Sequence, residues 1–444
     1  MEHLELTSDM IVSGTILVLT FIGIFTEHLH GFARSKAAMM GAGCMMGAGL
    51  YFGFYDADLA VKAIDWNVIF LLGAMMTIVA IMIPTGGFNA LASSLARRSK
   101  GNPYLMLVLL GTAVTLISLL LDNVTTVVIF GPLIILIARV MKISPVPTLM
   151  AAALLSDTGG VATLVGDPPN LMIGSAAHID FNTFVFRMWG PVLAAWVGIL
   201  IALRFLFWKE LSHKPEVTEI EQEVVKNPQI WKSSLVVMAV MVVLFTIHDK
   251  IGWEPWMVSA LGLTLLLFIG RSIVLDHAFE EVEFALLIFF VSLFILIGGV
   301  EQTHFLEYIG QLIQPLVTYN LLWATLILMW VAAVLSAAID NIPFTAAMIP
   351  ILLGMEAQGI NVTPLWWGLA IGVGMGGNGT HIGSTANVYI VTISERLARQ
   401  ENDPSLRITP GVWFRTGTPA MLLTLLLSSI VFVIFFEFFA APIH

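Results

Sequence analysis

The sequence predicts an all-α polytopic membrane protein built from two similar halves. Of its 444 residues, 58% are hydrophobic and only 11% are charged, whereas about a quarter of the residues in a soluble domain are charged. The mean hydropathy is +0.92, and apolar runs of about 20 residues, long enough to cross a bilayer, recur along the chain. Two polar motifs interrupt these runs, and each motif occurs twice. We therefore expect about ten transmembrane helices together with two re-entrant hairpins and two broken helices.

A polar linker divides the chain into two repeats. Residues 208–231 are charged and contain proline, a composition typical of an exposed segment. We predict the first repeat at 1–207 and the second at 232–444. Apolar spans are expected in both repeats, at 10–28, 37–54, 66–84, 188–207, 232–248, 256–275, 284–300 and 417–437. The first of these spans follows an acidic segment with no cleavage site, which indicates a retained helix and not a signal peptide.

The first duplicated motif is an Asp-Asn pair between two apolar runs. The segment "LDNVTTVVIFGP" occupies residues 121–132, and "IDNIPFTAAMIP" occupies residues 339–350. We expect each pair at the tip of a helical hairpin that enters the membrane, the hairpins being 103–141 and 321–356. Backbone groups at such a turn are tolerated at membrane depth only where they line a cavity or are buried in protein.

The second duplicated motif is rich in glycine. The segment "GGVATLVGDPPN" at 159–170 aligns without gaps to "GGNGTHIGSTAN" at 376–387. Gly and Pro inside apolar segments predict broken helices, which we place at 147–177 and 364–395. Interrupted helices from two halves that meet near the midplane are typical of a substrate site in a transporter.

The basic residues predict the orientation of the chain. Those that follow the first and third spans are placed in the cytoplasm, which puts both termini outside and the linker inside: Arg34, Lys36, Arg97, Arg98 and Lys100. The segment 301–320 contains no Lys or Arg and is placed outside as a loop. Five crossings in each half then give the two repeats opposite orientations.

Carboxylates within the motifs are the sharpest functional signals. A carboxylate at the bilayer centre costs about 2.5–3.5 kcal/mol on insertion scales, so it is normally functional or neutralised. We expect Asp122 and Asp340 to carry the coupling charge, with Asp167 supporting them. The alternative for the first two is an N-cap at the hairpin tip. Asp157 could be an N-terminal cap of the broken segment, and the alternative is a direct functional role. Sodium could bind at Asp122, Asn123, Asp340 and Asn341.

Neutral polar residues complete the predicted site. They offer donors and acceptors to a small solute, and their alternative role is hydrogen bonding between membrane helices. The set comprises Asn123, Thr125, Thr163, Gly166, Asn170, Asn341, Asn378, Thr380, Ser384 and Asn387.

Several classes of protein are not indicated. The single cysteine, Cys44, permits no intrachain disulfide or thiolate metal site. The glycine-rich motif lacks the Gly-Lys-Ser/Thr ending of a nucleotide-binding loop, and no His-Glu-x-x-His motif is present. We expect no enzyme, no cofactor and no nucleic-acid partner.

The motifs "LDNVTT", "GDPPN", "DNIPFTAAMIP" and "GGNGTHIGSTANV" resemble the ion transporter superfamily, and more narrowly its ArsB/P-protein permease family with a citrate-transporter-like domain. The resemblance covers nearly the whole chain. It implies inverted repeats, elevator-type alternating access, assembly as a homodimer and a place in a bacterial inner membrane. It also implies a small inorganic or ionic solute, with protons or sodium as the coupling ion, and leaves a cytoplasmic ATPase subunit open as a partner.

One departure orders the candidate substrates. The dicarboxylate branch of the superfamily has Ser-Asn-Thr at its hairpin tips, where this chain has Asp-Asn. Two carboxylates would repel a dicarboxylate, and no Lys or Arg lies near either motif in the sequence. We therefore expect proton-coupled efflux of arsenite or antimonite first, a sodium/proton antiporter second and an organic anion transporter third. A non-transporting membrane receptor is the alternative from another class.

Overall fold

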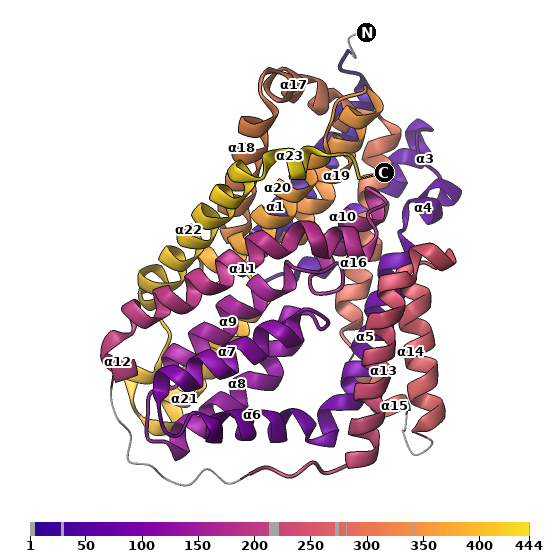
Figure 1. The fold of residues 1–444 in the computed structure, drawn as a ribbon. Helices are drawn as coiled ribbons and strands as arrows, with labels where there is room; N and C mark the ends of the chain where they lie inside the picture. Colours follow the sequence, from indigo (N-terminus) through magenta and orange to yellow (C-terminus); the bar gives the residue numbers. More distant parts are fainter. Residues whose placement is uncertain are drawn as a thin grey trace.

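The structure is a computed structural model that describes residues 5–27, 31–212, 222–270, 275–280, 282–338 and 341–443. Every regular element in these ranges is a helix (Figure 1). The predicted all-α polytopic fold is therefore confirmed.

The first half contains eleven described helices and a 3-10 turn. In chain order they are α1 Ser8–Phe25, α3 Arg34–Phe52, α4 Ala57–Ala63, α5 Trp66–Met82, η1 Ile83–Thr85, α6 Gly87–Arg98, α7 Pro103–Ser118, α8 Asn123–Val140, α9 Val146–Gly160, α10 Pro168–Ala176, α11 Phe181–Leu206 and α12 Trp208–Ser212.

The second half repeats this order with a few additions. Its described elements are α13 Pro228–Ile247, η2 Asp249–Ile251, α14 Pro255–Ile269, α15 Leu275–Glu280, α16 Phe284–Gln302, α17 Phe305–Tyr319, α18 Leu321–Ala338, α19 Asn341–Ala357, α20 Thr363–Gly376, η3 Gly377–Gly379, α21 Thr385–Glu401, η4 Pro404–Leu406, α22 Pro410–Ile434 and α23 Phe436–Ala440. Helix α13 begins at Pro228, which lies inside the predicted linker.

The repeat is visible in where the helices begin. Helices α5, α6, α7 and α8 recur as α16, α17, α18 and α19, each beginning 218 residues later, and α9 and α10 recur as α20 and α21 at an offset of 217. Helix α6 lies at the bottom of the molecule in Figure 1 and its counterpart α17 at the top. These two repeat-related helices thus lie at opposite ends (Figure 1), as an inverted relation between the halves requires.

The helices pack as two bundles. Helices α7–α11 pack with α18–α22, and we call this group the core bundle. Helices α1, α3, α5, α13, α14 and α16 pack mainly with one another and form the outer bundle. Helices α6 and α17 connect the two along the chain. The expected loop at 301–320 is wrong, because α17 occupies most of it and packs its apolar side on α19.

Eight helices of the described chain are long and apolar enough to cross a membrane. Six of them, α1, α5, α11, α13, α16 and α22, fall on predicted spans, and the other two are the hairpin arms α8 and α18. Helix α14 is apolar but shorter. The count of ten crossings stays a prediction.

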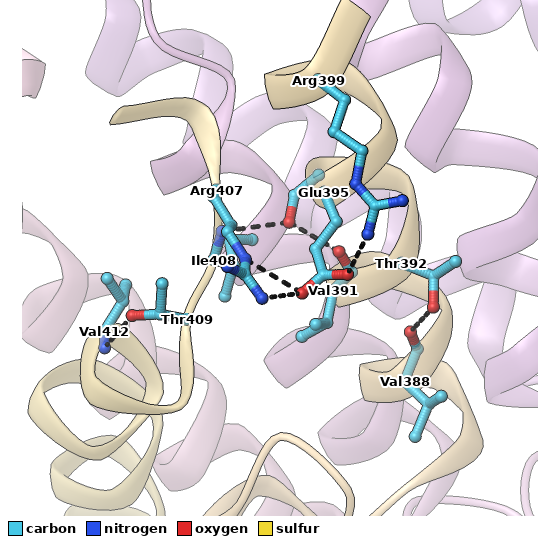
Figure 2. A network of polar contacts seen from close by, with 10 residues as sticks. Val388, Val391, Thr392, Glu395, Arg399, Arg407, Ile408, Thr409 and Val412 are labelled. Carbon is cyan, nitrogen blue, oxygen red and sulfur yellow. Dashed lines mark hydrogen bonds and ion pairs between the residues drawn. The ribbon is translucent and has the colours of Figure 1, made fainter. Parts of the chain in front are cut away.

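A polar network fixes the second broken helix to the last long helix. Glu395 Oε1 of α21 accepts hydrogen bonds from Arg407 Nη2 at 2.5 Å and Nε at 3.0 Å, and the other carboxylate oxygen lies 3.6 Å from Arg399 Nη2 (Figure 2). Nearby, the Ile408 amide donates to Ser394 Oγ at 3.0 Å. The chain is thereby tied to α21 just before α22 begins.

Candidate functional site

The tip of the first hairpin is capped by its own carboxylate. Helix α7 ends at Ser118 and α8 begins at Asn123, with Asp122 as its N-cap. The Asp122 carboxylate accepts a hydrogen bond from the Thr125 amide at 2.9 Å and one from the Thr125 hydroxyl at 2.5 Å. Asp122 thus caps the start of α8 through Thr125, as its position before the helix predicts. At the second tip, Asp340 lies outside the described residues.

Each broken helix is held open by one asparagine. Between α9 and α10, Asn170 Nδ2 donates to the carbonyls of Gly160 and Thr163, both at 3.0 Å. Before α21, Asn387 Nδ2 donates to the carbonyls of Gly377 at 2.9 Å and Thr380 at 3.1 Å. The two residues therefore satisfy backbone carbonyls that the missing helical turns leave unpaired.

Threonine and glycine fasten each break to the hairpin of the same half. The Thr163 hydroxyl donates to the Leu119 carbonyl, and the Thr380 hydroxyl donates to the Ala337 carbonyl. A Cβ atom on Gly166 would lie 2.6 Å from the Ser118 carbonyl oxygen, so only glycine allows this close approach. These residues shape the site through the backbone.

Asp157 is the centre of the first polar cluster. Its Oδ1 atom accepts hydrogen bonds from Asn123 Nδ2 at 2.6 Å and from Ser384 Oγ at 2.9 Å. Asp157 is 1% exposed and lies in the last turn of α9, far from the start of that helix at Val146. Its interpretation as an N-terminal cap is therefore wrong. It joins a hairpin tip of one half to a broken helix of the other.

Asp167 is the centre of a second cluster with the same plan. Its Oδ2 atom accepts from Asn341 Nδ2 at 3.4 Å, and a Cβ atom on Gly374 would lie 3.6 Å from the same oxygen. By the repeat alignment, Gly374 occupies the position of Asp157, and Ser384 occupies the position of Asp167. Each cluster therefore contains one carboxylate and one hairpin-tip asparagine, and both carboxylates come from the first half.

Asn378 links the two broken helices directly. Its Nδ2 atom donates to the Leu154 carbonyl at 3.2 Å and to Thr158 Oγ1 at 3.3 Å, both on α9. Its own carbonyl accepts from Trp413 Nε1 at 3.0 Å. The structure thus brings the predicted residues of both halves together, with Asp122 and Thr125 forming a separate cap beside Asn123.

Several buried oxygen atoms at the two breaks have no hydrogen-bond partner among the described residues. They are Asp157 Oδ2, Asn170 Oδ1, Asn378 Oδ1 and Asn387 Oδ1. The three amide oxygens are acceptors, and so is Asp157 Oδ2 when the carboxyl group is ionised, so a ligand that satisfied them would supply hydrogen-bond donors or positive charge.

One basic residue reaches the second motif, contrary to the expectation from the sequence. Arg34 Nη2 on α3 of the outer bundle lies 3.4 Å from Thr385 Oγ1, the first residue of α21. The two residues are 351 positions apart in the chain, so their proximity is invisible to a search for basic residues flanking the motif.

Comparisons with known proteins agree with this architecture. A sequence model of the family described as "Citrate transporter" matches residues 16–372. The chain is 33% identical over 396 residues to the 46 kDa membrane protein of Mycobacterium leprae (strain TN), with 87% of this chain and 91% of that protein covered. It is 29% identical over 486 residues to the P protein of Homo sapiens, which covers 89% of this chain and 58% of that longer protein.

A solved structure shares the fold. The YdaH transporter of Alcanivorax borkumensis superposes with a TM-score of 0.61 over 98% of this chain and 100% of its own, at 14% sequence identity. The fold and the matched family are those of multi-pass plasma membrane transporters, not enzymes. With its match over residues 16–372, the chain belongs to the citrate transporter family.

Proposed function

We propose that this transporter exports a small neutral trihydroxide, arsenous or antimonous acid, in exchange for protons. The observation that carries the proposal is the set of unpaired buried acceptors at the two breaks, which includes Asp157 Oδ2 and the side-chain carbonyls of Asn170 and Asn387. Arsenous acid is uncharged near neutral pH, and its hydroxyl groups are donors for such acceptors. A fixed positive charge is not needed to hold it.

The two carboxylate clusters supply the coupling in this proposal. Asp157 and Asp167 each face the amide of a hairpin tip, Asn123 and Asn341 respectively. A buried carboxyl group can exchange its proton for contact with the solute, so that only one of them occupies the site at a time. Asp122 and Asp340, adjacent to these amides in the chain, would support the exchange. The core bundle would carry the site across the membrane relative to the outer bundle, with α6 and α17 as connectors.

Two alternatives rest on particular observations. The same oxygen-rich clusters would suit sodium, which favours a sodium/proton antiporter as the second candidate. Arg34 beside Thr385 is a cation near the second motif and favours an organic anion as the third. A receptor that binds without transport would need only one accessible state, whereas a broken helix and a hairpin-tip asparagine that contacts a carboxylate occur in both halves.

The test is solute flux in proteoliposomes that contain the purified protein. Arsenite, sodium and citrate are compared, each with and without an imposed pH gradient. We expect arsenite flux that depends on the gradient and that falls at least about tenfold in Asp157→Asn. Flux of sodium alone would favour the antiporter, flux of citrate alone the organic anion transporter, and binding without any flux the receptor.

Assembly is also part of the proposal. We propose a homodimer in the membrane and a cytoplasmic ATPase subunit as an optional partner. Within each protomer, we place the two repeats at 1–207 and 232–444. The mass of the purified complex in detergent, with and without co-expressed cytoplasmic proteins, tests both partners.

A further inference from the structure

A cavity of about 320 Å³ lies where the core bundle meets the outer bundle, and neither Asp157 nor Asp167 is among its lining residues. Its walls come from the first broken helix and from the connection between α13 and α14. Leu164 also lines the cavity, so the cavity touches the first glycine-rich motif, residues 159–170. The polar and titratable residues that line it are Asn67, Ser175, His178, Asp180, His248, Asp249 and Glu254.

His248 bridges the two bundles at this cavity. Its Nδ1 atom lies 2.8 Å from the Trp253 carbonyl oxygen, which is an acceptor only. Its Nε2 atom lies 3.4 Å from the amide nitrogen of Phe181, which is a donor only. These partners require the neutral ring with its proton on Nδ1 and with Nε2 as an acceptor. Trp253 lies just before α14 of the outer bundle, and Phe181 is the first residue of α11 in the core bundle.

Two further contacts place the same elements against each other. Asn182 Nδ2 donates to the Thr246 carbonyl at 2.6 Å. The rings of Phe181 and Phe245 are stacked with their centroids 5.4 Å apart. The junction between α11 and the end of α13 is therefore a defined contact with an imidazole ring at its centre.

We propose that His248 is a positioning residue that joins the core and outer bundles at this face when neutral and releases them when protonated. A proton on Nε2 would turn that atom from an acceptor into a donor that faces the donor N–H of Phe181. The bridge to α11 would then be replaced by repulsion, while the bond to Trp253 within the outer bundle could remain. Protonation therefore acts specifically on the contact between bundles.

Charged and titratable groups from both bundles face the cavity beside His248. The titratable groups facing the cavity with His248 are His178 after α10, Asp180 at the start of α11, Asp249 on η2 and Glu254 before α14. Asp180 is the N-cap of α11 and accepts from the amides of Asn182 and Thr183. The Asp180 carboxylate is thus engaged at the start of α11 by these two amides. Exposed Lys250 is the neighbouring cation on η2.

The inference needs only relative motion of the bundles and does not depend on the identity of the solute. Distances between spin labels measure it directly, in the absence of any solute. The labels are placed by Ile251→Cys in the outer bundle and Ala357→Cys in the core bundle, both at exposed positions, with Cys44 replaced by Ser. Between pH 8 and pH 5.5 we expect a second, longer distance to appear. One linked proton changes the ratio of the two states by at most about tenfold per pH unit.

Variants of His248 and of its partner make the test specific. His248→Gln cannot take up a proton and should show one distance at both pH values. His178→Gln alters the same cavity without touching the bridge and should keep the pH response. Phe181→Pro removes the donor N–H at the first position of α11, where proline is well tolerated, and should show the longer distance at both pH values. Phe181→Ala loses the ring but keeps the N–H and should retain the response.

A wild-type distance that does not change with pH would overturn the proposal, as would a full pH response in His248→Gln. If His248→Gln does not fold, the pair at Phe181 decides: identical behaviour of the alanine and proline variants would also overturn it. Because no solute is present, these outcomes are independent of whether arsenite is transported.

Discussion

Ser384 Oγ donates a hydrogen bond to Asp157 Oδ1 over 2.9 Å, although the two residues are 227 positions apart. Ser384 caps the second broken helix and Asp157 lies in the first, so this bond crosses between the halves. In the mirrored pair, Asp167 and Gly374, a Cβ atom on the glycine would lie 3.6 Å from Asp167 Oδ2, so here the carboxylate is at the other position. Each of the two pairs therefore contains one carboxylate. In the first pair it comes from the position of Asp157, and in the second pair from the position of Asp167.

Removing the charge at Asp157 should stop coupled transport without unfolding the protein. In Asp157→Asn the amide oxygen can still accept from Asn123 and Ser384, so the packing is retained while the ionisable group is lost. We expect gradient-driven arsenite flux in proteoliposomes to fall at least about tenfold, the effect of losing about 1.4 kcal/mol. Asp58→Asn on the exposed part of α4 is the control and should transport normally. Normal flux in Asp157→Asn would exclude this residue from coupling.

Gly374 should be intolerant of a side chain for a reason that a second substitution can remove. A Cβ atom at this position would lie 2.2 Å from Val161 Cγ2, and Val161 is fully buried. Gly374→Ala should therefore destabilise the protein by about 1–3 kcal/mol, measured as a lower midpoint of thermal unfolding in detergent. Val161→Ala removes the clashing methyl group, so the double variant should recover most of the loss. A double variant as unstable as Gly374→Ala would show that the clash is not the cause.

The sequence predicted the break points better than the chemistry between them. The Asp-Asn motifs indicated where α8 and α19 begin, because a capping residue before an apolar run is a local signal. Asp157 was misjudged, since its repeat counterpart is Gly374 and the duplication therefore gave no signal there. The proximity of Arg34 to Thr385 spans the whole fold and has no local signature.

The short connecting helices were missed for a different reason. Helices α6 and α17 contain 12 and 15 residues, too few to cross a membrane, and lie between apolar spans. A search for spans assigns such segments to loops. Both helices are amphipathic, but the surface that each apolar side covers is identified only once the positions of the hairpins are known.

Replacing Asn170 or Asn387, the asparagines at the two breaks, should lower the stability of the protein. Asn170→Ala and Asn387→Ala each leave two backbone carbonyls without their donor, which costs about 1–3 kcal/mol for each buried group. Asn→Asp at either position should be worse, because it places an acceptor against two carbonyls. Thermal unfolding of the four variants measures the order. The control is Asn402→Gly, at the exposed C-cap of α21. Asn182, although exposed, is unsuitable because its side chain bonds to the Thr246 carbonyl. An unchanged midpoint of thermal unfolding in the aspartate variants would contradict the role of these asparagines in holding the backbone carbonyls.

The predicted orientation can be tested with single cysteines in a Cys44→Ser background. Lys226 and Tyr319 are both exposed, and Tyr319 is 89% exposed at the end of α17. A membrane-impermeant thiol reagent added to intact cells should label Tyr319→Cys, while Lys226→Cys should react only after the cells are permeabilised. The reverse pattern would invert the topology, and labelling of both positions from outside would contradict the inverted repeat.

Arg34 separates the candidate solutes, because its charge matters to an anion and not to a neutral acid. Its guanidinium contacts Thr385 at the start of α21, next to Ser384 of the first cluster. If the solute is arsenous acid, Arg34→Gln should leave arsenite flux within about threefold of the wild type, since about 0.6 kcal/mol or less is at stake for an uncharged ligand. An organic anion would instead lose the cation beside the second motif, and flux should fall more than about tenfold. Lys36→Gln, on the exposed side of the same helix, is the control for a general loss of positive charge. A collapse of arsenite flux in Arg34→Gln, with normal flux in Lys36→Gln, would count against the neutral trihydroxide and in favour of an anionic substrate.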